Sequence, residues 1–478
     1  MKRFFALLLT LLLILSTFAA CKGNELGAES NTDTDINGQA GDGTGDVSSD
    51  VGDADVEDNK GDDSADDGAN DGADDSEDGK ENEDTESKPA YVPKKESTSG
   101  LKFALNEDGQ SYTLVGKGSC TATELVIDGY KGLPVTKIGY AAFENDKKIT
   151  KVTIGDGVKH IDMYAFSMCS AITSVSMGKG VEVIDNAAFR YCSALTAINI
   201  GSSVERIGDT AFYNSGKLND INIPSSVKVI EAYAFDKTAY FKNEANWKNK
   251  VLYIGKCLYK AKTDISGKYT VTDGTTVIAH EAFWGCESLT GIVIPNSVKT
   301  IGGKAFFKAK KLTSVTIGTG VERIGDEAFY NSGYYNASGN WKNNVLLIGD
   351  YVIKAKPELS GSYNIPAGTR AIADVAFGSC NKVTSINIPE SVVGVGDYAF
   401  NGCSSMTNLT IGSGVKRIGE NAFKGCVALK SATIKKTSDW SVAWKSAGID
   451  VSADSLSNKA SAALLLTYEY YDLPWYRG

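Results

Sequence analysis

The dipeptide Ala-Phe recurs eleven times in this chain at an almost constant spacing. Eight of the ten intervals between its phenylalanines are 23 residues long, and the other two, Phe235 to Phe283 and Phe329 to Phe377, are 48. A fixed period of this length is the signature of a repeat protein, whose units bury their apolar faces against one another. We therefore expect a repeated structural core built on Phe143, Phe166, Phe189, Phe212, Phe235, Phe283, Phe306, Phe329, Phe377, Phe400 and Phe423.

The apolar residues around each phenylalanine predict a solenoid that is mainly β, with short helical turns. An isoleucine stands five residues before ten of the phenylalanines, and Val395 takes that place before Phe400. In a standard repeat, residues such as Leu195, Ile198 and Ile200 follow, and the last two alternate with other residues as in a strand. Gly or Pro with Ser then marks a turn. One coil with one strand per 23 residues accounts for this pattern.

The two 48-residue units, at about 236–282 and 330–376, carry matching insertions. Each reads as strand, glycine-containing turn and strand, which predicts a hairpin that leaves the solenoid. Two interpretations stay open for the aromatic residues of the insertions. They either pack the hairpins onto the solenoid or contact a ligand at the hairpin tips, and the candidates for ligand binding are Tyr240, Phe241, Trp247, Tyr334, Tyr335 and Trp341.

The N-terminus indicates export. Two basic residues, an apolar run from Phe4 to Leu15 and small residues up to Ala20 are typical of a signal peptide over residues 1–20, and the run is short for a membrane span. The small residues before Cys21 resemble the bacterial lipobox, although Phe18 stands where leucine is usual, so an ordinary cleaved signal remains the alternative. Lipids on Cys21 would hold the protein at a membrane, and they would be its only anchor.

Residues 21–98 predict a disordered acidic linker. Between Lys22 and Lys88 there are 24 acidic residues against 4 lysines, whereas Pro89 to Gly478 has 43 Lys plus Arg against 35 acidic residues. A segment with so few apolar residues cannot offset its chain entropy by burial. The stretch from Asp33 to Gly38 resembles the start of a calcium loop but has Thr44 where an acidic ligand is needed, so a solvated spacer is favoured.

From about Gly100 to Ile434 the pattern Leu-x-x-Val-x-Ile-Pro-x-x-Val-x-x-Ile-Gly-x-x-Ala-Phe-x-x-Cys resembles the BspA-type class of bacterial leucine-rich repeats. The resemblance implies a right-handed solenoid over residues 135–434. It also implies a cap with a hairpin over 99–134 and a C-terminal cap over 435–478. Proteins of this class act as bacterial surface antigens that adhere to host matrix proteins or to other bacteria.

No residue pattern indicates a catalytic, metal or cofactor site. The only two histidines, His160 and His280, fall in variable positions where we expect solvated side chains. Most cysteines share one repeat position, three residues after the phenylalanine, which favours buried free thiols over disulfides. The outward strand positions, such as Ser174, Asn199 and Thr316, are small and polar.

These observations predict a non-catalytic, exported, monomeric lipoprotein of the cell surface that presents its solenoid for adhesion or protein–protein interaction. The alternative is a glycan-binding lipoprotein for nutrient capture or wall attachment, and an inert envelope spacer is a third hypothesis. Nucleic acid is not expected as a partner, because the protein is exported and its lysines form no visible stripe in the sequence.

Overall fold

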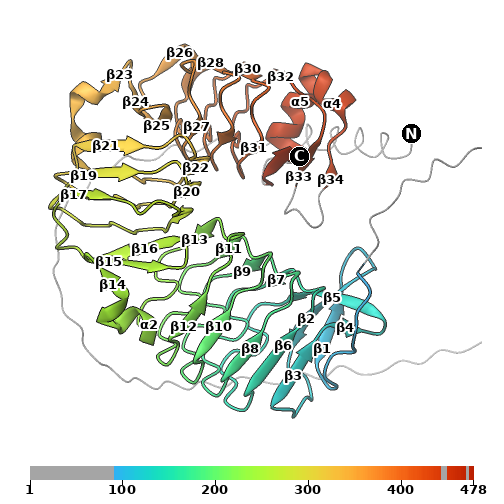
Figure 1. The fold of residues 1–478 in the computed structure, drawn as a ribbon. Coiled ribbons are helices and arrows are strands. Elements are labelled where there is room, and N and C mark those ends of the chain that lie inside the picture. Colours follow the sequence, from blue (N-terminus) through green and yellow to red (C-terminus); the bar gives the residue numbers. More distant parts are fainter. Residues whose placement is uncertain (1–90, 443–448, 470–472, 478) are drawn as a thin grey trace, which may run out of the picture. The chain divides into compact units, whose positions relative to one another are not determined.

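The repeats stack as coils that each cross two parallel sheets (Figure 1). The structure, a computed structural model, describes residues 91–442, 449–469 and 473–477, which all lie in the unit Thr85–Gly478. Strand partners in successive standard coils are 23 residues apart, as with Asn199 and Asn222 in one sheet and Ile207 and Ile230 in the other. The predicted leucine-rich-repeat solenoid is confirmed.

The longer strand of each coil contains the apolar residues that follow the phenylalanine. In β6, for example, Val152 and Ile154 are buried while Lys151 and Thr153 are exposed, which is the alternation of a strand with one face on the core. These long strands are β3 (Glu124–Ile127), β6 (Lys151–Ile154), β8 (Ser174–Ser176), β10 (Ala197–Asn199), β12 (Asp220–Asn222), β17 (Gly267–Thr270), β19 (Leu289–Ile294), β21 (Ser314–Ile317), β26 (Ser360–Asn364), β28 (Lys382–Ile388), β30 (Asn408–Ile411) and β32 (Ser431–Ile434).

A second strand in each coil ends at the isoleucine, or in one coil Val395, that stands five residues before the phenylalanine. The prediction of one strand per coil is therefore wrong. Most of these strands have two residues, too few for an alternating pattern to appear in the sequence. Pairing with the neighbouring coils holds them extended. The short strands are β5 (Leu133–Ile138), β7 (His160–Ile161), β9 (Val183–Ile184), β11 (Arg206–Ile207), β13 (Val229–Ile230), β18 (Val277–Ile278), β20 (Thr300–Ile301), β22 (Arg323–Ile324), β27 (Ala371–Ile372), β29 (Gly394–Val395) and β31 (Arg417–Ile418).

The turn from short strand to long strand carries the phenylalanine and is bonded to the next turn in the stack. In the first repeat the amides of Ala141, Phe143 and Asn145 each donate to a turn carbonyl of the next coil, at 3.0, 2.8 and 2.8 Å. Ala141 and Asn145 have left-handed backbones, with φ of 49° and 62°. The same two positions, two residues before and two after the phenylalanine, are left-handed in every repeat. These turns therefore stack in register, and equivalent side chains line up along the solenoid.

The phenylalanine rings stack on one another inside the core. Neighbouring rings lie 5.0 to 5.4 Å apart between centroids and are nearly parallel. The stack is interrupted at the two insertions. Tyr259 meets Phe235 edge-on at 5.8 Å, and Tyr363 meets Phe377 tilted at 5.8 Å. The core therefore contains three runs of stacked rings.

The shared cysteine position supplies a hydrogen-bond donor to the previous coil. Cys169 Sγ donates to the Phe143 carbonyl at 3.0 Å, and Ser215 Oγ donates to the Phe189 carbonyl at 2.9 Å. All eight described cysteines are buried and free, as predicted. Burial raises the pKa of the Cys169 thiol to about 12. The thiols at the repeat position therefore donate to backbone carbonyls of the previous coil and complete the bonding of the turns.

The insertions do form antiparallel hairpins, but the prediction that these leave the solenoid is wrong. The second hairpin strands, β16 and β25, pair in parallel with the short strands β18 and β27. Both faces of the hairpins carry apolar residues, such as the buried Val251 and Leu252, so the core must cover both. The insertion elements are α2 (Ala239–Lys242), η1 (Glu244–Asn246), β14 (Trp247–Lys248), β15 (Val251–Ile254) and β16 (Cys257–Ala261), then α3 (Gly333–Asn336), η2 (Ser338–Asn340), β23 (Trp341–Lys342), β24 (Val345–Ile348) and β25 (Tyr351–Ala355).

Both ends of the stack are covered. Hairpin β1 (Lys102–Leu105) and β2 (Tyr112–Gly116) precedes the first coil, and β4 (Gly129–Tyr130) pairs with β5. At the other end are β33 (Trp440–Val442), β34 (Ile449–Asp450), α4 (Ala453–Ser457), α5 (Lys459–Leu464), η3 (Leu465–Glu469) and β35 (Trp475–Arg477). Strand β35 pairs with β31, and Trp440 and Trp475 are buried against each other. None of the described helices has the length and apolar character to cross a membrane.

Candidate binding surfaces

The outward side chains of the long strands form a flat polar face. Ser174, Asn199 and Thr316 are exposed there, as the alternation predicts. Some of these side chains bond to each other along the stack, as where Asn222 Nδ2 donates to Asn199 Oδ1 at 2.9 Å. Binding hot spots are usually rich in Trp, Tyr and Arg. This face lacks them and is a weak candidate for a protein contact.

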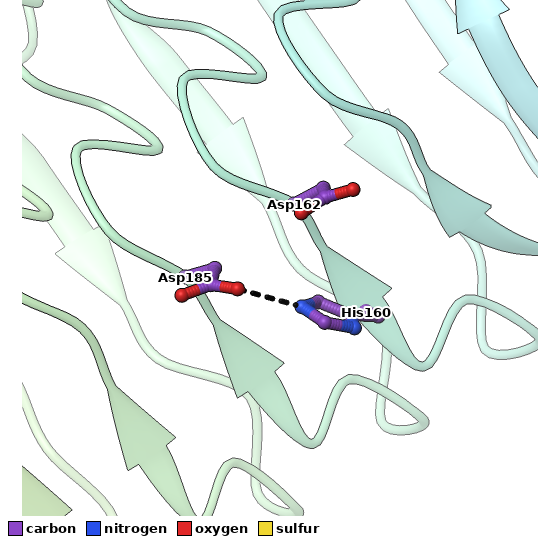
Figure 2. A group of neighbouring side chains, drawn as sticks. All are labelled: His160, Asp162 and Asp185. Atoms are coloured by element: carbon purple, nitrogen blue, oxygen red, sulfur yellow. Dashed lines mark hydrogen bonds and ion pairs between the residues drawn. The ribbon is translucent and has the colours of Figure 1, made fainter. Parts of the chain in front are cut away.

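The short strands carry a ladder of opposite charges on their outer side. His160 Nε2 lies 3.2 Å from a carboxylate oxygen of Asp185 (Figure 2). Lys137 Nζ lies 2.8 Å from Asp162, and Arg206 Nη1 lies 3.2 Å from the other oxygen of Asp185. The prediction of a solvated His160 is therefore wrong, because its side chain is only 35% exposed and contacts Asp185. The parallel register of the short strands brings these residues together.

His160, Asp162 and Asp185 bring candidate ligand atoms within 4.8 Å of one another, as a metal site requires. Lys137 and Arg206 already pair with the two carboxylates, and their positive charges would oppose a bound metal ion. Burial disfavours ionisation of Asp185, but the hydrogen bond from His160 and the charge of Arg206 hold its pKa well below the usual range. We therefore assign this group to the ion-pair ladder.

The ladder continues past the first insertion with two further groups. His280 Nδ1 lies 3.0 Å from Glu231, so this histidine also contacts a carboxylate instead of being solvated. Arg323 lies 2.9 Å from Asp374 and shares Asp397 with Arg417. Burial raises the pKa of Asp374 to about 6 against the attraction of Arg323.

Between the His280 group and the Arg323 group lies a small cleft. Gly302, Gly303 and Gly325 contribute no side chains there, which leaves a volume of about 150 Å³. Small-molecule sites usually have about 300–1,000 Å³. This cleft is too small for such a ligand.

The aromatic residues of the first insertion use most of their polar atoms internally. Tyr240 donates its hydroxyl to the Tyr253 carbonyl at 2.9 Å, and Trp247 donates Nε1 to the Phe241 carbonyl at 2.9 Å. The rings of Phe241 and Trp247 meet edge-on at 5.4 Å. All three candidate residues are half-buried. They hold the short helices α2 and η1 against the hairpin.

The second insertion repeats this arrangement and adds a connection to the turns. Tyr334 donates to the Leu347 carbonyl at 3.2 Å, and Trp341 donates Nε1 to the Tyr335 carbonyl at 2.8 Å. Tyr335 contacts Trp341 at 5.2 Å and, on its other side, Tyr330 at 5.0 Å. Tyr330 belongs to the repeat turn after Phe329, and its side chain is 42% exposed. The insertion aromatics are thus part of a larger surface.

That surface, which we name the cation–aromatic ridge, follows the turns after the phenylalanines. The ridge was not predicted from the sequence, where only strand positions and insertions were taken as candidate surfaces. Its signal is that aromatic and basic residues recur one and two positions after the phenylalanine. In the structure these rings and cations contact one another. The ridge has an N-terminal cluster of Arg190, Tyr191, Tyr213 and Lys237 and a C-terminal cluster of Trp284, Phe307, Lys308, Tyr330, Tyr335, Trp341 and Lys356.

The structure describes the predicted core phenylalanines but not the predicted lipidation site. The repeat phenylalanines form the buried stack, with side chains at most 2% exposed. Cys21, the predicted lipidation site, lies outside the described residues, as do the predicted signal peptide and most of the linker.

Comparisons with known proteins agree with the repeat pattern. A model of the BspA type leucine rich repeat region, in six copies, matches residues 119–242, 230–360 and 347–440. No curated protein matches the chain. Several solved structures resemble it, among them a leucine-rich repeat protein of T. pallidum, with 22% identity over 46% of this chain and 91% of that one and a TM-score of 0.33.

Two further solved structures cover more of the chain. A leucine-rich cell surface protein of Faecalibacterium prausnitzii is 21% identical over 74% of this chain and 97% of its own, with a TM-score of 0.26. The pneumococcal vaccine antigen PcpA is 18% identical over 74% of this chain and 84% of its own, with a TM-score of 0.25. Since the family model spans more than half of the residues, the chain belongs to the BspA-type leucine-rich repeat family.

Proposed function

We propose that this protein is a non-catalytic, lipid-anchored adhesin of the bacterial cell surface, and that the cation–aromatic ridge is its contact surface. Its family suggests protein–protein interaction, so the first candidate partner is a protein on a host cell or another bacterium. Lipids on Cys21 and an acidic linker would hold the solenoid away from the membrane.

The observation that carries this proposal is the composition and exposure of the ridge. Trp284 and Tyr330 are 41% and 42% exposed, and their rings lie beside basic side chains and other aromatic rings. Such residues dominate binding hot spots, because they bury a large area at a low cost in side-chain entropy. The flat strand face and the small cleft offer no comparable contact.

The backbone supports this role by holding the ridge in place. Each ridge turn is bonded to its neighbours through main-chain groups, as where the Phe306 amide donates to the Ala328 carbonyl at 2.7 Å and the Lys308 amide donates to the Tyr330 carbonyl at 3.1 Å. A surface that is ordered before binding loses little conformational entropy on complex formation.

The test is an array of matrix proteins and glycans probed at physiological salt with residues 22–478, the chain without the predicted signal peptide and the proposed lipidated Cys21. We expect saturable binding that falls when Trp284 and Tyr330 are both changed to Ala. The matched control is Tyr398→Ala, because Tyr398 lies in a repeat turn outside both ridge clusters and is 37% exposed. Binding that survives the double change, with both variants folded, would refute the ridge as the contact surface.

A further inference from the structure

Four basic side chains of the ridge lack an acidic partner. Arg190, Lys237, Lys308 and Lys356 have no carboxylate oxygen within 4.0 Å in the described part of the chain, and they rest on aromatic rings instead. Lys237 Nζ lies 4.9 Å from the Tyr213 centroid, and Lys356 Nζ lies 4.9 Å from that of Trp341. A cation held on a ring keeps most of its outer surface available for an anion.

The acidic residues of the same turns make contacts elsewhere. Asp236, next to Lys237 in the sequence, accepts a hydrogen bond from the Tyr259 hydroxyl at 2.5 Å, and two glutamates in the turns of the C-terminal cluster pair with lysines outside the four. Glu287 lies 2.7 Å from Lys310, and Glu327 lies 3.8 Å from Lys304. Most carboxylates of the charge ladder lie one or two residues after the short strands and are paired there with Lys, Arg or His. The ridge therefore combines exposed aromatic rings with unpaired positive charge, a combination that neither strand face has.

Within each cluster the cations and rings of neighbouring coils contact one another. Arg190 and Lys237 lie two coils apart, and the Tyr213 ring of the coil between them contacts both, at 5.6 and 4.9 Å. Lys308 contacts Trp284 of the preceding coil and Phe307 of its own, at 5.9 and 5.4 Å. A surface with a repeating pattern of charges and rings fits best to a ligand that also repeats, since several equal contacts then form at once.

From this geometry we infer that the ridge binds a linear polyanionic polysaccharide, one whose sugars carry sulfate or carboxylate groups. Sugar C–H faces would stack on Trp284, Tyr330 and neighbouring rings, while the acidic groups meet the unpaired cations through charge-assisted hydrogen bonds. No recess is needed, because such a chain can lie along a shallow surface. This inference rests on the proposed function, since it names the ligand of the same ridge.

The first measurement is the affinity of residues 22–478 for dextran sulfate at several salt concentrations, with uncharged dextran and polyglutamate as comparison ligands. If four cations release counterions at about 0.7 per charge, raising NaCl from about 50 to about 200 mM weakens binding about 50-fold. Uncharged dextran should not bind, and polyglutamate should bind much more weakly because it cannot stack on the rings.

The variants separate the charge from the shape of the lysines. Changing Lys237, Lys308 and Lys356 together to Gln leaves one of the four cations, so the same rise in salt should weaken the remaining binding only about threefold. Changing the three to Arg keeps the charge and should keep the affinity. The matched control changes three exposed lysines that lie outside the ridge to Gln, namely Lys102, Lys268 and Lys382.

The outcomes distinguish this inference from the proposed function. Equal affinity for dextran sulfate and polyglutamate would overturn the polysaccharide in favour of an acidic protein partner. If the control triple lowers dextran sulfate binding as much as the ridge triple, the net charge is responsible and the inference fails. If the ridge binds only an uncharged protein, the polyanion is refuted while the adhesin stands. If binding on the array is unchanged in both the aromatic variant and the lysine variant, the ridge as contact surface and the polyanionic ligand are both refuted.

Discussion

Replacing Phe212 with Ala tests whether the stacked rings hold the coils together. The Phe212 side chain is fully buried, and its ring is nearly parallel to those of Phe189 and Phe235, at 5.4 and 5.2 Å. Removing a buried phenylalanine usually costs about 3–5 kcal/mol, and we expect the upper part of that range, since the cavity would lie between two rigid coils. The free energy of unfolding can be followed by circular dichroism in urea.

Phe143 provides the internal comparison, because its ring has a stacked phenylalanine on one side only, Phe166 at 5.1 Å. Its replacement with Ala should cost less than that of Phe212 by about one ring pair, or ~0.5–1.5 kcal/mol. Tyr140→Ala serves as the control, since this ring is 64% exposed and its loss should cost under about 1 kcal/mol. A Phe212→Ala cost below about 1 kcal/mol, or one no larger than that of Phe143→Ala, would refute the reasoning.

Three further predictions concern the thiols, the buried acids and the metal question. Cys192→Ser should change stability by under about 1 kcal/mol, because a hydroxyl can donate to the Phe166 carbonyl as the thiol does. Cys192→Ala removes the donor and should cost about 1–3 kcal/mol. Urea unfolding of the two variants measures the difference. The pKa of Asp374 is raised in the folded state from 3.8 to about 6, so its ionisation should lower stability as pH rises through that window, and Asp374→Asn should make this slope shallower in melting curves. Zinc should not raise the melting temperature of the wild type, because basic residues occupy the carboxylates beside His160; a rise that His160→Ala removes would contradict the ion-pair assignment.

Much of the fold could be predicted from the sequence, because every repeat places apolar residues at the same positions and so indicates the same buried face. The constant interval between the Ala-Phe dipeptides indicated the coil length, and the alternation after each phenylalanine indicated the long strands. Cysteines at one repeat position, with Ser215 and Ser332 in the same place, indicated small buried side chains instead of disulfides. Each of these features is local in the sequence and follows from periodicity alone.

Other features depend on contacts between coils, which no local pattern contains. All but one of the short strands have two residues, and they exist because neighbouring coils pair with them. The hairpins were expected to leave the solenoid, but β16 and β25 join the short-strand sheet, where both of their faces are covered. His160 was expected in solvent, and the parallel register sets it against Asp185, a residue of the next coil.

The sequence by itself determined that the chain would stack in coils of 23 residues, because the free energy of burying the same apolar residues in each unit selects that architecture. Only the tertiary structure decided which polar side chains meet. Residues two coils apart, such as Arg190 and Lys237, share the Tyr213 ring because bonded turns stack in register. The candidate ridge is a product of that register, since its members are scattered along the sequence and become one surface only when the coils are stacked.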